Sequence, residues 1–228
     1  RKIIIADKFK IYNTDFSLKA EAMAHWIGGQ LMNWTYNRKL LENKKWLDFG
    51  CGNGRRTREI NKYLNFNEKN IFTADVDSWH NYKEDRIKPY NFIKIEPNKK
   101  LPIKSNNFDI VSLIMVLHHV EDIDNLLREL NRIIKLNGHV YVREHDAFTD
   151  SDKMLVDVEH AMYGITYYNE KNFKKDYYCR CFNFIEVILL FEKYGFQYIW
   201  GKIASDDFKA DITITRSNNN IFKKIKNI

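Results

Sequence analysis

The sequence predicts an α/β fold of the doubly wound type, built on a mostly parallel sheet. Three observations predict it. Short apolar runs alternate along the chain with segments of helical periodicity. Residues 108–117 are apolar almost throughout, as a parallel strand buried on both faces requires. A glycine-rich turn, residues 50–54, follows another apolar run directly. We therefore expect parallel strands joined by helices, with binding residues at their carboxyl ends.

The length and composition indicate a single domain with an anionic partner. The 228 residues, 44% of them hydrophobic, are enough for one domain over 1–228, with an arm at 1–16 and a basic, loosely held tail at 216–228. The net charge of +7 favours nucleic acid or a nucleotide phosphate, although a bias toward Lys, Asn and Ile would also produce it. Because the chain starts at Arg1 rather than Met, we expect a domain excised from a longer, multi-domain protein.

The apolar runs and the cysteines indicate the cellular compartment in which we expect the protein. No apolar run reaches the roughly 18 residues of a membrane span, so we expect no membrane partner. The three cysteines, Cys51, Cys179 and Cys181, are odd in number and lack zinc-site spacing. We expect free thiols in a reducing compartment, a cytoplasmic location and no metal site.

The glycine-rich turn is the first candidate binding element. It forms the pattern Asp48-x-Gly50-x-Gly52-x-Gly54 between a strand near residues 45–49 and a helix near 56–64. The helix directs its free N–H groups and its positive dipole end at the turn, where an acidic ligand group would bind. Asp48 would receive an ammonium group. The alternative is a tight turn in some other α/β protein.

A second strand, residues 70–75, ends in the next candidate, Asp75. This acid lies 21 residues beyond Gly54, a separation suited to a carboxylate that accepts both hydroxyls of a ribose. Asp77 is the competing candidate, and either aspartate has the alternative role of capping a loop. A short strand at 90–96 and the step Leu101-Pro102 follow.

The remaining elements are predicted from periodicity and turn residues. Upstream, one helix begins at residue 17 and reaches 34 or 37. After His118-His119 comes a helix that we expect to end at Asn137-Gly138, and then a strand at 139–144. Further helices are expected at 151–164 and 183–194, the latter closed by Gly195, and strands at 196–203 and 210–215.

Together, Asp48, the glycine turn, Asp75 and the Leu101-Pro102 step resemble the class I S-adenosylmethionine-dependent methyltransferases. The resemblance implies a Rossmann-like methyltransferase fold with a seven-stranded sheet and a terminal antiparallel strand. It implies S-adenosyl-L-methionine as the cofactor, with the residues after the third strand beside its adenine. The implied cofactor-binding residues are Asp48, Gly50, Gly52, Gly54, Asp75, Glu96 and Met115.

A narrower resemblance concerns the methyl acceptor. Residues 112–119 are similar to the strand end of mRNA cap guanine-N7 methyltransferases, and residues 143–146 and 157–163 to the corresponding domains of capping enzymes from large DNA viruses. This resemblance implies methylation of capped RNA, triphosphatase and guanylyltransferase modules in the same chain, and a host-cytoplasm or virion location. It places His118 and Glu159 in a base pocket, with Tyr163, Tyr177 or Tyr178 stacked on the guanine.

The end of the central strand separates the acceptor classes. Its residues, 114–117, carry neither the Asp/Asn-Pro-Pro-aromatic run of adenine amino-methyltransferases nor the acid of ribose 2′-O-methyltransferases. Guanine N7 has a free lone pair and needs only in-line placement, so no acid or base catalyst is predicted. Arg55, Arg56 and Arg58 would meet the triphosphate. The alternatives are a small-molecule methyltransferase and a non-catalytic partner subunit.

Overall fold

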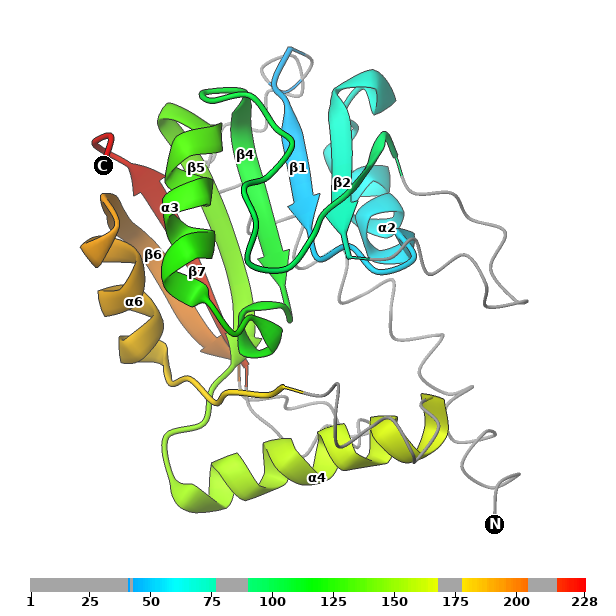
Figure 1. Cartoon of the computed structure of the whole chain (residues 1–228), viewed down its shortest axis with the longest axis vertical. Coiled ribbons are helices and arrows are strands. Elements are labelled where there is room, and N and C mark those ends of the chain that lie inside the picture. Colours follow the sequence, from blue (N-terminus) through cyan, green and yellow to red (C-terminus); the bar gives the residue numbers. More distant parts are fainter. Residues whose placement is uncertain (1–40, 42, 77–89, 168–177, 205–216) are drawn as a thin grey trace. The chain divides into compact units, whose positions relative to one another are not determined.

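The computed structural model describes residues 41, 43–76, 90–167, 178–204 and 217–228 (Figure 1). The chain divides into two compact units, residues 1–94 and 95–228, which are described separately. The predicted arm at 1–16, the helix beginning at residue 17 and the strand at 210–215 lie outside the described residues.

The first unit is a parallel array with the strand order β3-β2-β1. Its strands are β1 (Trp46–Phe49), β2 (Ile71–Asp75) and β3 (Phe92–Lys94). All four residues of β1 are buried, as the apolar run predicts. The register pairs Asp48 with Thr73 and Phe49 with Ala74, so β1 and β2 end at nearly the same level. Parallel pairing therefore brings the glycine turn to the end of β2 that carries Asp75.

The glycine turn leads into α2 (Arg55–Leu64), as predicted. Gly54 is the N-cap residue of this helix, and Ile60 and Leu64 form its fully buried side. The helix is capped after Leu64 by Asn65, whose backbone is left-handed with φ 56° and whose N–H donates to the Asn61 carbonyl. A short 3₁₀ turn, η2 (Glu68–Asn70), connects this part of the chain to β2.

The second unit combines parallel and antiparallel strands in the order β4-β5-β7-β6. These are β4 (Phe108–Ile114), β5 (Ile134–His145), β6 (Phe196–Ala204) and β7 (Ser217–Lys224). β4 and β5 are parallel, whereas β7 lies antiparallel between β5 and β6. The predicted antiparallel ending is therefore confirmed, with a different last strand.

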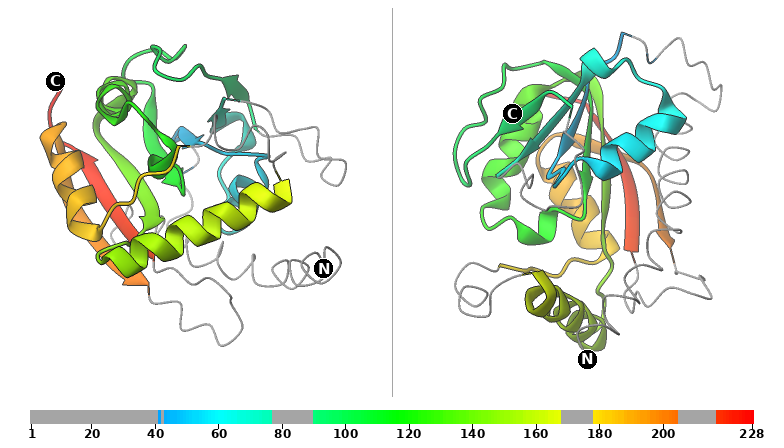
Figure 2. Two further views of the ribbon diagram at one scale, coloured as in Figure 1. Left: turned by 60° about the horizontal axis from the view of Figure 1, so that its bottom comes forward. Right: turned by 90° about the vertical axis from the view of Figure 1, so that its right-hand side faces the viewer.

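The second unit contains one 3₁₀ turn and three helices in its described residues: η3 (Leu117–His119), α3 (Ile123–Ile133), α4 (Asp150–Tyr167) and α6 (Phe184–Lys193). α3 and α6 cover the same side of these strands, and α4 crosses beyond the carboxyl ends of β4 and β5 (Figures 1 and 2). α6 begins with a capping box between Asn183 and Glu186, and Gly195 follows it at φ 79°, as predicted.

The predicted end of the helix at Asn137-Gly138 is wrong. α3 ends at Ile133, and β5 begins with the next residue. Asn137, at φ 64°, and Gly138 lie inside β5, where its register against β4 is irregular. A Cβ added at Gly138 would come within 2.6 Å of Ile134 Cγ2 and 3.0 Å of the Asp109 carbonyl oxygen. This glycine therefore permits close packing in a strand instead of terminating a helix.

The prediction of a loosely held basic tail at 216–228 is also wrong, because residues 217–224 form the inner strand β7. Asn218, Asn219 and Asn220 are fully buried. The Asn218 amide donates to the His145 carbonyl (2.9 Å), and the Asn219 Oδ1 accepts from the Tyr141 hydroxyl (2.8 Å). Asn218 and Asn219 can be buried because groups of β5 form these hydrogen bonds with them. The Asn220 amide N–H instead donates to the Asn218 Oδ1 of the same strand at 2.9 Å, and the Asn220 Oδ1 has no hydrogen-bond partner among the described residues. Polarity alone predicted exposure and was misleading here.

Candidate active site

The glycine turn of the first unit has a backbone that glycine alone adopts without strain. Gly50, Gly52 and Gly54 have φ values of 72°, 56° and 77°. The N–H groups of Gly50 and Cys51 donate to the Ala74 carbonyl at 2.7 and 3.2 Å, which ties the turn to the end of β2. A Cβ added at Gly52 would meet no atom within 4 Å, so the backbone here faces open space. This cradle fits close approach by a ligand.

Asp75 lies directly against this turn. Its Oδ2 accepts from the Gly52 N–H at 2.7 Å, and its Oδ1 accepts from the Val76 N–H at 2.7 Å. The carboxylate is half-buried at the carboxyl end of β2. This is the position that the ribose assignment requires. Asp77, the competing candidate, lies outside the described residues.

Asp48 is almost entirely buried, with 2% of its surface exposed. Its Oδ2 accepts from the Thr57 hydroxyl of α2 at 2.5 Å. This bond fixes the carboxylate below the turn and connects β1 to the first turns of the helix. Burial raises the pKa of the neighbouring Cys51 thiol, and the charges of Asp48 and Asp75 raise it further. Cys51 is therefore a neutral thiol at physiological pH, and it is not activated as a nucleophile.

Arg58 of α2 has a contact that the sequence analysis did not predict. Its guanidinium lies over the Tyr90 ring, 4.2 Å from the centroid. A cation held over an aromatic face in this way is positioned by that ring. Binding of a triphosphate by Arg55, Arg56 and Arg58 stays a prediction.

The other two predicted cofactor residues, Glu96 and Met115, belong to the second unit. Met115 follows β4 in a left-handed conformation with φ 61°, and its N–H donates to the Arg143 carbonyl at 2.8 Å. Such a conformation is uncommon for a residue with a long side chain, and strained residues cluster at binding sites. Glu96 is exposed and forms an ion pair with Lys99. Their roles stay predictions.

The Leu101-Pro102 step is fixed by two side chains of α3. The Glu129 Oε2 accepts from the Leu101 N–H at 2.7 Å, and the Arg132 guanidinium donates to the carbonyls of Leu101 and Ile103 at 3.2 and 2.7 Å. Glu129 and Arg132 also bond each other at 2.6 Å. The hydrogen bond from Arg132 lowers the pKa of Glu129.

The predicted acceptor-site residues lie near the carboxyl ends of β4 and β5. His118 in η3 is buried, and its Nδ1 lies 2.5 Å from the Glu144 Oε1. Glu159 is half-buried in α4, the helix that also contains Tyr163. Tyr178 is half-buried, while Tyr177 lies outside the described residues. The base-pocket roles of these residues stay predictions, and no described contact tests them.

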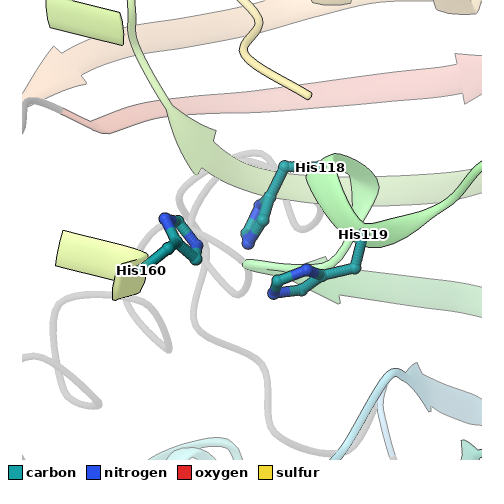
Figure 3. Close-up of side chains that lie close together, drawn as sticks. All are labelled: His118, His119 and His160. Atoms are coloured by element: carbon teal, nitrogen blue, oxygen red, sulfur yellow. The ribbon is translucent and has the colours of Figure 1, made fainter. Parts of the chain in front are cut away.

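Sequence reasoning missed a cluster of histidines around His118. The rings of His119 and His160 have centroids 4.0 and 5.0 Å from that of His118 (Figure 3). The centroid of the His145 ring is also 5.0 Å from that of His118. Removal of water from around the rings, together with the neighbouring histidines, lowers the pKa of His118 and of His145 to about 3 and that of the partly accessible His119 to about 4. These imidazoles are therefore neutral at physiological pH. Adjacent histidines at 118–119 are the only local signal for the cluster.

Glu144 is fully buried beside these histidines. It accepts from the backbone N–H groups of His118 at 3.3 Å and His145 at 2.8 Å. Burial raises its pKa, while the His145 contacts oppose that shift. The sequence analysis used Glu144 only as part of a resemblance and assigned it no contact.

A glycine turn after one parallel strand and a carboxylate at the end of the next define a nucleoside-binding α/β protein. More narrowly, the chain belongs to a methyltransferase family, since the family model described as "Methyltransferase domain" matches residues 23–199. That match includes Asp48, the glycine turn and Asp75.

Sequence relatives of several activities support this assignment. The chain is 26% identical over 151 residues to the sterol 24-C-methyltransferase of Schizosaccharomyces pombe, covering 64% of this chain and 40% of that protein. It is 30% identical over 140 residues to the tRNA U34 carboxymethyltransferase of Nautilia profundicola, covering 58% and 42%. It is 27% identical over 110 residues to the ubiquinone biosynthesis O-methyltransferase of Pelagibacter ubique, covering 46% and 43%. The chain thus spans less than half of each of these relatives.

Solved structures confirm the fold. A putative sarcosine dimethylglycine methyltransferase from Galdieria sulphuraria superposes with a TM-score of 0.59 at 12% identity, covering 91% of this chain and 87% of that one. An S-adenosylmethionine-dependent methyltransferase from Methanosarcina mazei gives a TM-score of 0.57 at 14% identity, covering 81% and 93%. The predicted Rossmann-like methyltransferase fold, with seven strands and an antiparallel edge, is therefore confirmed.

The family and the fold identify S-adenosylmethionine as the cofactor, as predicted. The glycine turn fits it, because the turn faces open space and carries a carboxylate for hydroxyl groups. Among the helices that the structure describes, none combines the length and the hydropathy needed to cross a lipid bilayer.

Proposed function

We propose that this chain transfers a methyl group from S-adenosylmethionine to guanine N7 of an mRNA cap. Asp75 against the Gly52 amide is the observation that carries the cofactor half of the proposal. In this scheme Asp75 holds the ribose hydroxyls and the backbone of the glycine turn lies against the amino-acid end. Bound there, the cofactor supplies an electrophilic sulfonium methyl.

The acceptor half rests on the end of β4. Residues 114–117, Ile-Met-Val-Leu, bring no carboxylate to this position. An acceptor that must lose a proton needs a base within hydrogen-bond reach, whereas guanine N7 attacks through an existing lone pair. The net charge of +7 adds long-range attraction for a capped RNA. In this scheme the chain's task at the acceptor is to position it in line, which is itself a large contribution to rate.

A small-molecule acceptor is the second candidate. Two relatives favour it, since one is named for methylation of a sterol and the other for ubiquinone biosynthesis, and neither name refers to RNA. In that case the positive charge would have no part in acceptor binding.

One experiment separates these candidates. The chain is incubated with methyl-labelled cofactor and, in parallel, with GpppN-capped RNA, the same RNA bearing a 5′-triphosphate, and a mixture of small acceptors. Digestion and chromatography then identify the labelled product. We expect 7-methylguanosine from the capped RNA alone.

Label in a small acceptor or in an internal nucleoside would contradict cap methylation. Cofactor binding without transfer to any acceptor would support a non-catalytic partner subunit instead. The Asp75→Ala variant is the control, because at cofactor concentrations near the wild-type Kd it must lose most of the transfer if the label comes through the proposed site.

A further inference from the structure

Three histidines meet beyond the carboxyl ends of β4 and β5. His118 and His119 come from η3, and His160 comes from α4 (Figure 3). Each offers one potential ligand atom, and these atoms all lie within 4.8 Å of one another. Donor atoms that are ligands to one ion must lie this close together.

The hydrogen bonds of the rings fix their tautomers. The Nδ1 of His160 lies 2.7 Å from the Val156 carbonyl oxygen, and that of His119 lies 3.0 Å from the Tyr178 carbonyl oxygen. A carbonyl oxygen can only accept, so Nδ1 carries the hydrogen in both rings. Their lone pairs are therefore on Nε2, the atom that binds metals when Nδ1–H is held in this way.

His118 follows the same pattern with a stronger partner. Its Nδ1 lies 2.5 Å from the Glu144 Oε1, and the backbone N–H groups of His118 and His145 hold that carboxylate in place. A buried carboxylate that orients an imidazole is the usual outer partner of a metal-binding histidine.

We propose that His118, His119 and His160 bind a divalent transition-metal ion, zinc in the first place. Imidazole nitrogens suit zinc, and three protein ligands leave a fourth position for water or for another side chain. The His145 ring lies beside two of these ligands, with its centroid 5.0 Å from that of His118 and 5.1 Å from that of His160. The ion would join η3 to α4, two segments that are distant in the chain.

The cysteine pattern predicts no metal, but this site needs no cysteine. Its ligands come from two segments, without the short spacing of a recognisable motif. His118 is also a predicted residue of the acceptor pocket, but none of the three ligands belongs to the glycine turn that holds the cofactor. Metal binding is therefore measured without cofactor or RNA.

The test uses the full chain, stripped of metal with a chelator and dialysed. Zinc is titrated by calorimetry, and cobalt by visible absorption. We expect one ion per chain and the intense visible bands of tetrahedral cobalt with nitrogen ligands. His119→Gln and His160→Gln should each weaken binding at least 100-fold. His119 is exposed, so its substitution should leave the circular dichroism spectrum unchanged.

The matched control is His139→Gln, in the half of β5 that is remote from Glu144. It should bind zinc as the wild type does. Three results would overturn the proposal: no stoichiometric binding to the wild type, equal affinity in His119→Gln and His139→Gln, or a sulfur-to-cobalt charge-transfer band. The last would assign the ion to the free cysteines.

Discussion

Two polar regions of the molecule, each at the carboxyl ends of parallel strands, are built in different ways. In the first unit, the glycine turn after β1 is a run of five residues completed by Asp75 at the end of β2. In the second unit, the region beyond β4 and β5 is made of side chains such as His118, Glu144 and His160, which come from separate elements.

The difference lies in what satisfies the polar groups. In the turn, backbone N–H groups and positive φ values determine the arrangement, and the neighbouring residues of the chain specify both. In the second unit, buried polar side chains bond groups that are distant in sequence. Substitutions in the turn should therefore alter cofactor binding more than stability, and substitutions of the buried polar groups should do the reverse.

The largest effect is expected from Asp75→Ala. Hydrogen bonds to a charged group contribute about 1.5–3 kcal/mol each, and the proposed ribose contact includes two of them. We expect the affinity for S-adenosylmethionine, measured by calorimetry, to fall about 100-fold, which corresponds to ~2.7 kcal/mol. The melting temperature should change little, because the carboxylate is only half-buried.

The control for that variant is Asp157→Ala, which removes an exposed carboxylate of α4. It should bind the cofactor like the wild type. If Asp75→Ala retains the cofactor affinity within threefold, the ribose does not bind at this end of β2. The claim that substitutions near the glycine turn mainly affect cofactor binding would then be wrong.

The reverse case is Lys224→Met in β7. Lys224 is fully buried, and its ammonium donates to the carbonyls of Asn131 and Ile134 at 2.6 and 2.8 Å, where α3 passes into β5. Methionine fills a similar volume but leaves both carbonyls without this donor, at a cost of about 2 kcal/mol. We expect denaturant unfolding to show that loss while cofactor affinity stays unchanged.

Lys223→Met is the matched control, because Lys223 directly precedes Lys224 in the same strand and is only half-buried. Its free energy of unfolding should stay within about 0.5 kcal/mol of the wild type. If both variants lose the same free energy of unfolding, the hydrogen bonds of the buried Lys224 ammonium do not contribute to stability beyond what a half-buried lysine of β7 contributes.

The parts of the fold that sequence could predict are those with local signals. β1, α2 and β2 follow from an apolar run, three glycines and a second apolar run, and α6 follows from Asn183 and Gly195. β7 could not be predicted in this way. Its asparagine run and Lys224 are polar, and partners in other elements, such as those of Asn218 and Lys224, make their burial favourable.

In the candidate site, too, the residues with local sequence signals could be predicted and the contacts between distant residues could not. Asp75 could be placed because an apolar strand stops directly before it, and the structure puts its carboxylate on Gly52. The bond between His118 and Glu144 spans 26 positions, and nothing in the spacing of those residues indicates it. The sequence could therefore indicate a strand end with histidines but not the arrangement of their rings.

Two glycine-to-alanine substitutions, one in each region, test the proposed difference between the glycine turn and the second unit. Gly138→Ala would place a Cβ 2.6 Å from Ile134 Cγ2 and 2.9 Å from the Lys135 carbonyl oxygen, so the backbone must shift at a cost of about 2 kcal/mol. Gly52→Ala meets no atom within 4 Å and is strained only through its φ of +56°, at about 1 kcal/mol. Only Gly52→Ala should also reduce cofactor affinity. Loss of affinity in Gly138→Ala alone would contradict the division between the two regions.

The smallest expected effect concerns Glu129, whose charged side chain is neither fully buried nor fully exposed. Glu129 and Arg132 form an (i, i+3) pair whose side chains are 12% and 22% exposed, and Glu129 also accepts from the Leu101 N–H. We expect Glu129→Gln to lower the free energy of unfolding by about 1 kcal/mol at neutral pH. Glu59→Gln, in the exposed (i, i+3) pair with Lys62, is the control and should cost less than about 0.5 kcal/mol.

The pH dependence of the difference in unfolding free energy between the wild type and Glu129→Gln identifies the cause of that difference. Arg132 lowers the pKa of Glu129 in the folded chain below the value of about 4.3 for an unperturbed glutamate. The ionised carboxylate therefore stabilises the folded state fully above that value, and the contribution is lost as the pH falls through the folded pKa. Since glutamine does not titrate, the gap between wild type and Glu129→Gln should narrow below about pH 4. A gap that stays constant in chemical denaturation down to pH 3 would show that shape and hydrogen bonding alone, without charge, hold the Leu101-Pro102 step.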